Sequence, residues 1–174
     1  MSYHRILSKV DDALVAYIVG AGAGESMDPV NPTATPGDTW PAKRSLDRIL
    51  PGTICEAKSW DSEEGMEFAG NLRVNASITI RTSAALDTGD TTQADAILTA
   101  SEVRVAEVFD LFYPDADGVD SGTLADALTT AAHAAGIEVT VFGAVVTGGN
   151  RTQTSEAWED VLELSLLCAP SIIT

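Results

Sequence analysis

The stretch that decides the fold is Leu72-Arg73-Val74-Asn75-Ala76-Ser77-Ile78-Thr79-Ile80-Arg81. Apolar and polar side chains alternate through it, which is the period of a β-strand that buries one face. The pattern therefore predicts a strand whose apolar side meets a core. Its other side carries Arg73 and Arg81 and is expected to meet solvent or a partner protein.

Three further strands are indicated. The segment 158–168 alternates in the same way, from Trp158 to Cys168, and 53–60 forms a weaker candidate. Ile137, Val139 and Val141 begin a strand rich in β-branched residues. The run 147–151, Thr-Gly-Gly-Asn-Arg, has turn-forming composition and is predicted to be the turn between the last two strands.

Helical periodicity marks three other segments. Apolar residues from Ile6 to Ile18 recur on one helical face, and the glycines of 20–24 end that helix. Two capping-box patterns, at Thr92 and Thr123, open helices that run to about Phe112 and to Gly136. The order helix, hairpin, two helices, hairpin favours antiparallel pairing within one sheet.

The prolines of residues 25–52 predict an extended loop after the N-terminal helix, with one helical turn near 45–50. A chain of 174 residues fits a single domain over 1–174. We thus expect an α+β fold: one sheet of about four mainly antiparallel strands flanked by helices, with this long Pro-rich loop.

Charge limits the classes of partner. Twenty-six acidic and ten basic residues give a net charge of -16, which disfavours binding to a phosphate backbone. No segment reaches the roughly 20 apolar residues that span a bilayer. We therefore expect neither specific DNA binding nor a membrane anchor.

Catalytic motifs are not indicated. Asp87-Thr88-Gly89 matches a short aspartic-protease tripeptide but precedes a predicted helix, and Asp115, Asp117 and Asp120 lack EF-hand spacing. Cys55 and Cys168 are interpreted as buried reduced thiols, with one disulfide left open. We expect no enzymatic activity, no catalytic residue, no cofactor and no metal.

The element order, the long loop before the first strand and the C-terminal strand Trp158-Glu159-Asp160-Val161-Leu162-Glu163-Leu164 resemble the tail terminator proteins of long-tailed bacteriophages. The resemblance spans most of the chain. It implies a structural virion protein, assembled in the host cytoplasm, that forms a homo-hexameric ring at the head-proximal end of the tail. Such a ring ends tail-tube polymerisation and joins the tail to the head.

The implied partners are other copies of the chain, the tail-tube protein and the head-tail connector or neck proteins, while genome DNA passes through the lumen without specific binding. Acidic residues in the lumen would repel the phosphates. The candidate interface residues are Arg73, Arg81, Arg151, Ile172 and Ile173. The alternatives are a head-tail joining or neck protein, a tail-tube subunit, or a non-viral acidic protein-binding module.

Overall fold

A computed structural model describes residues 4–21, 39–41, 52–62, 71–83, 91–113, 121–153 and 157–171. Its elements are α1 His4–Gly20, β1 Thr39–Pro41, β2 Gly52–Ser62, β3 Leu72–Ser83, α2 Thr91–Asp110, α3 Ser121–Ala134, β4 Val139–Gln153 and β5 Ala157–Pro170. The strands form one sheet in the order β1-β2-β3-β5-β4. The α+β class predicted from sequence is confirmed.

The four long strands are antiparallel to their neighbours, as expected. Only the three-residue β1 is parallel, pairing with Thr53–Cys55 of β2. It lies inside the segment predicted to be a loop, so that prediction was wrong at 39–41. The helical turn expected near 45–50 and the acidic loop 115–120 lie outside the described residues.

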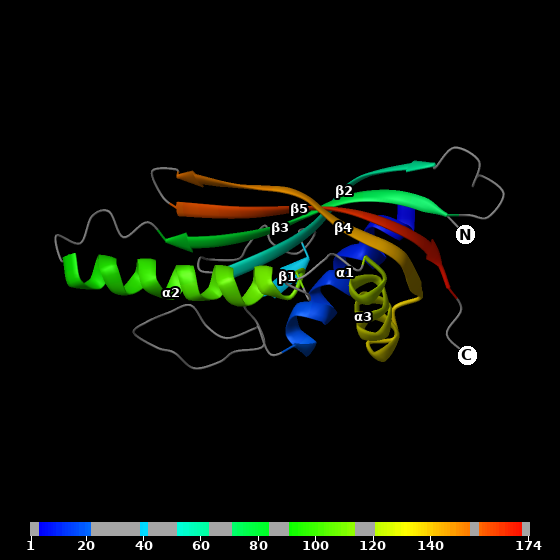
Figure 1. Ribbon diagram of the computed structural model, residues 1–174, viewed down its shortest axis with the longest axis horizontal. Coiled ribbons are helices and arrows are strands. Elements are labelled where there is room, and N and C mark those ends of the chain that lie inside the picture. The colour runs from blue at the N-terminus through cyan, green and yellow to red at the C-terminus, as the bar shows by residue number, and fades with distance from the viewer. Residues whose placement is uncertain are drawn as a thin grey trace.

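All three helices lie on one side of the sheet (Figure 1). The strand residues that face them are almost fully buried, as the alternating pattern predicted for β3 and β5. The largest fully buried side chains come from α1, α3 and these strands, and include Leu14, Ile18, Ile78, Ile80, Leu128, Leu164 and Leu166. Burial of such side chains stabilises the fold by about 1.5 to 3 kcal/mol each.

Gly136 ends α3 as predicted. Its φ of 72° lies in the left-handed region, which glycine adopts without a Cβ clash. The Gly136 amide donates to His133 O at 3.0 Å and the Ile137 amide donates to Ala132 O at 2.8 Å. These two bonds form a Schellman motif that satisfies the last carbonyls of the helix.

The turn predicted at 147–151 was wrong, because these residues lie within β4. Gly149 is required by crowding and not by a turn: a Cβ at this position would lie 2.9 Å from Val161 O of the neighbouring strand. β4 also carries two register shifts, at 141–143 and 146–148. Glycine and bulges both allow such local departures from a regular ladder.

Polar side chains from the helices bind irregular points of the outer long strands. Asp11 of α1 accepts from the Ala57 amide at 2.6 Å, beside the register shift of β2. Thr129 of α3 bonds to both backbone groups of Val141, accepting from its amide at 2.9 Å and donating to its carbonyl at 3.0 Å. The shift in β2 and the first shift in β4 thus each have a side-chain partner for a nearby backbone group.

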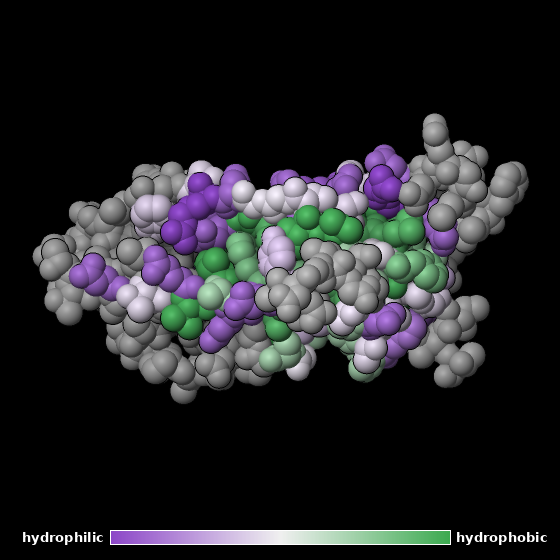
Figure 2. Space-filling model, in the orientation of Figure 1, coloured by the Kyte–Doolittle hydropathy of each residue, from purple (hydrophilic) through white to green (hydrophobic). Residues whose placement is uncertain are grey.

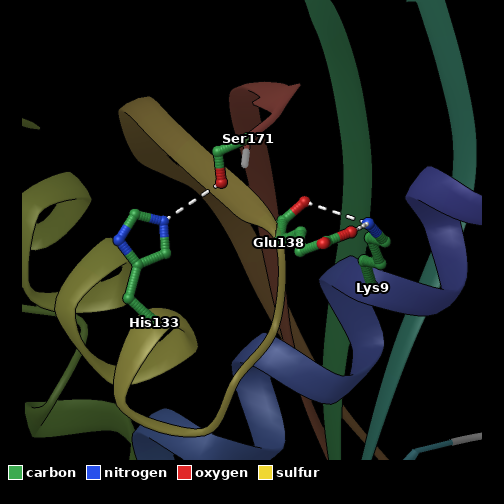
Figure 3. Close-up of polar contacts among 4 residues, drawn as sticks. All are labelled: Lys9, His133, Glu138 and Ser171. Carbon is green, nitrogen blue, oxygen red and sulfur yellow. Dashed lines mark hydrogen bonds and ion pairs between the residues drawn. The ribbon is translucent and has the colours of Figure 1, made fainter. Parts of the chain in front are cut away.

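The two ends of the last hairpin are tied to the helices at a polar cluster (Figure 3). Lys9 of α1 lies 2.9 Å from the carboxylate of Glu138, which precedes β4. His133 of α3 lies 3.1 Å from the hydroxyl of Ser171, which follows β5. The cluster fixes where the C-terminal segment leaves the sheet.

Helix α2 is anchored at its C-terminal half. Val108 and Phe112 are buried, and Phe112 meets the Tyr17 ring edge to face at 5.4 Å between centroids. Arg104 is also buried, and its Nε and Nη2 donate to Thr53 Oγ1 at 3.3 and 3.2 Å. The opposite side of this half of the helix remains exposed.

Candidate functional site: the open face of the sheet

The candidate site is the face of the sheet opposite the helices, which we call the open face. The cross-strand register places Glu56, Ser77 and Glu163 in one row across β2, β3 and β5. Lys58 lies 3.7 Å from Glu163, a loose and exposed ion pair. The middle of the open face is therefore polar, with charges of both signs.

Two of the predicted interface residues lie on this face. Arg73 and Arg81 are both exposed on β3, as the alternation predicted. Arg81 Nε donates to Glu159 Oε1 of β5 at 2.6 Å. An exposed pair of this kind stabilises the fold by only about 0 to 1 kcal/mol. The pair therefore orients the Arg81 side chain but contributes little to stability.

Arg151 lies elsewhere. It pairs in register with Asp160 on the helix-facing side, where its Nε and Nη2 donate to the two carboxylate oxygens at 2.7 and 3.2 Å. Its guanidinium also lies 5.9 Å from the Trp158 ring centroid. The hydrogen bond between its guanidinium and the Asp160 carboxylate raises the pKa of Arg151 above the usual value of an arginine. Arg151 therefore has an intramolecular partner, and its place in an interface stays a prediction; Ile172 and Ile173 lie outside the described residues.

Two apolar residues of β4 whose exposure the sequence did not predict are Phe142 and Val145, which are 55% and 46% exposed. Val145 lies opposite Ser165, between the inward-facing Ala144 and Val146, and so points to the open face. The run from 141 to 146 is almost continuously apolar, and the bulges change which of its side chains face the helices. Alternation could not separate buried from exposed positions in such a run.

A space-filling view shows where apolar side chains reach the surface. In Figure 2 the upper surface of the sheet is mostly polar, and the hydrophobic residues that are visible lie between the sheet and the helices below it. The residues that carry the exposed apolar area of β4 are Phe142 and Val145.

The described residues offer little for chemistry. None of them form a group of three or more His, Cys, Asp or Glu that could hold a metal ion. His133 contacts Ser171, but the neighbouring Glu138 pairs with Lys9 and does not orient the imidazole, as a catalytic triad requires (Figure 3). Asp87-Thr88-Gly89 lies outside the described residues.

The two cysteines are free and buried on different strands. Burial raises the pKa of the Cys168 thiol to about 12. Burial also raises the pKa of Cys55, and the nearby Asp11 carboxylate raises it further, while Arg104 acts in the opposite direction. A thiol that stays protonated is a poor nucleophile, so both behave as small core residues.

Comparison with known proteins gives no relative: no protein-family model matches the chain, and no curated protein is significantly similar to it. Among the described helices, none is long and apolar enough to cross a membrane. The open face is therefore interpreted from its own residues.

Proposed function

We propose that this protein is a structural subunit that works by assembling with other copies of itself into a ring. The observation that carries the proposal is the one-sided sheet: its open face exposes Val145, the strand β4 also exposes Phe142, and the helices fill the other face. A sheet normally buries its apolar residues against another layer, and exposed apolar residues on such a face favour a partner.

The specific role we propose is that of a tail terminator: a homo-hexameric ring at the head-proximal end of a bacteriophage tail, which ends tail-tube polymerisation and joins the tail to the connector. The element order supports it, since a helix, a hairpin, two helices and a second hairpin follow one another. The net charge of -16 is compatible with DNA sliding past without binding.

Electron microscopy of the purified full chain tests this role. The proposal expects closed rings with a central hole and a mass of about 109 kDa, six times the chain mass of 18.2 kDa. Rings that cap one end of purified tail tubes would support termination specifically. A single non-ring particle at every concentration would overturn the proposal and favour a protein-binding module.

A further inference from the structure

Within the described residues, the last strand of the sheet pairs with another strand on one side only. β4 pairs with β5, lies at the end of the strand order and is the longest of the described strands, with 15 residues (Figure 1). Every second residue of such an edge strand points its amide and carbonyl away from the neighbouring strand. These groups can bind the backbone of an added extended segment.

Edge strands are commonly protected by lysine, proline, bulges or a covering element. β4 contains no lysine, no proline and no acidic residue. Thr129 of α3 covers its edge at Val141, and both register shifts lie N-terminal to Gly148. From Gly148 to Gln153 the strand pairs residue by residue with β5, and 149–152 are all exposed. We call this second half of the strand, 148–153, the β4 edge.

An acidic side chain lies beside the β4 edge. Gly148 is the register partner of Glu163, and no atom lies within 4 Å of the Cβ position of Gly148. Lys58 lies 3.7 Å from Glu163, but the two side chains are 46% and 55% exposed, so their ion pair is loose. A strand added to β4 would lie about 10 Å from β5, which is two strand spacings. A long basic side chain placed opposite Gly148 would extend toward Glu163 across the bare glycine.

We propose that the β4 edge binds an extended segment of a partner protein that carries lysine or arginine on the side facing Glu163. The inference goes beyond the proposed function and does not depend on ring formation. The backbone of the segment would continue the hydrogen-bond ladder of the sheet, and its cations would meet the Glu163 carboxylate. The net charge of -16 would also attract a basic segment from a distance.

A second copy of this chain fits the β4 edge less well. Arg151 is the only charged residue of β4, and its guanidinium is bonded to Asp160 of its own chain. Two β4 edges would therefore meet without a cation for either Glu163. Each copy also carries the same net charge of -16, which opposes their approach. A basic segment of a different protein has neither disadvantage.

Amide hydrogen exchange of the full chain tests the proposal. The probe is a short synthetic peptide in which lysine alternates with threonine, and the matched peptide has glutamate in place of each lysine. We expect the lysine peptide to slow exchange at alternate amides of 148–153, because only the outward amides gain a partner. The glutamate peptide should leave them unchanged. Binding of the lysine peptide without protection of these amides would show unspecific attraction to an acidic protein and would overturn the proposal.

Substitutions of matched charge test the role of Glu163. Glu163→Gln should weaken binding of the lysine peptide about threefold, since one exposed ion pair is lost. The control Asp126→Asn, at an exposed position of α3, should have little effect. Lys58→Gln should tighten binding because it frees Glu163, and Arg5→Gln on α1 is its control. Equal effects of the edge variants and their controls would contradict a contact with Glu163.

The outcomes separate the β4 edge from the proposed ring. Rings that form while the peptide protects no amide of 148–153 would overturn the inference and leave the proposed function standing. A monomer that binds the peptide at the β4 edge would support the inference and overturn the ring. Protection of these amides that grows with protein concentration, without peptide, would show a second copy at the β4 edge and overturn the basic segment.

Discussion

The two faces of the sheet differ in what they contribute. The apolar side chains of β3 and β5 that face the helices are buried; Ile78 and Leu164, for example, are 0% and 1% exposed. The open face carries exposed ion pairs, hydroxyls and the exposed Val145. The first face holds the core, whereas the second is the face that we propose for assembly.

The same strand can serve both purposes because its side chains alternate. Val74 and Ile78 point to the core, while Arg73 and Arg81 point outward from the intervening positions. A substitution therefore affects stability or assembly according to the face it lies on.

Ile78→Ala should lower the free energy of unfolding by about 2 to 5 kcal/mol, because it leaves a cavity in the core. Its neighbour Thr79 faces the open side, so Thr79→Ala should change stability by less than about 1 kcal/mol. Urea unfolding followed by circular dichroism measures both. Equal losses for the two variants would break the distinction between the faces.

Thr129→Val should destabilise the fold by about 1 to 3 kcal/mol, since it removes the partner of both backbone groups of Val141. Thr129→Ser keeps the hydroxyl and serves as the matched control. Hydrogen exchange at the Val141 amide should accelerate in the valine variant only. Unchanged exchange there would show that α3 does not protect the start of β4.

Gly149→Ala should cost about 1 to 3 kcal/mol, because the new Cβ would lie too close to Val161 O. The adjacent Gly148 has no atom within 4 Å of its Cβ position, so Gly148→Ala is the control and should be nearly neutral. Thermal unfolding of the two variants compares them directly. A neutral Gly149→Ala would contradict the close approach of β4 to β5.

Stability should fall as pH rises above about 9. The pKa of Cys168 is raised in the folded state, so the unfolded chain loses the thiol proton first and is favoured at high pH. The expected loss is about 1 to 2 kcal/mol for this thiol between pH 8 and 10. Urea titrations of Cys168→Ala should show a shallower decline; an identical decline would argue against a buried, protonated thiol.

Arg81→Ala should change stability by less than about 1 kcal/mol, since its pair with Glu159 is exposed. Arg81 stays a predicted interface residue. A change in the particle mass of Arg81→Ala without a change in its free energy of unfolding would support that prediction. Loss of stability as large as that of Ile78→Ala would place Arg81 in the fold instead.

Much of the fold could be predicted because its signals are local. The alternation of 72–81 defined β3, and the periodicity of α1 and the glycine after α3 defined those helices. The turn at 147–151 was misplaced because glycine has two uses, in turns and where backbones approach closely. Gly149 lies where two backbones approach closely, and only the position of Val161 on the neighbouring strand reveals this.

The candidate site was less predictable. The exposure of Arg73 and Arg81 could be predicted from the alternation within one strand, but the partner of Arg151 depends on the register between two strands. Phe142 and Val145 lie in a bulged apolar run, where parity changes within a few residues. Exposure of such residues depends on which face the helices cover, and that is a property of the tertiary structure.

The most direct test of the open face as an assembly surface is the mass of the purified full chain by light scattering over a dilution series. We predict a particle of several chains at high concentration that dissociates on dilution, and a lower mass for Val145→Glu. A mass of 18.2 kDa at every concentration, identical in the variant, would contradict the account.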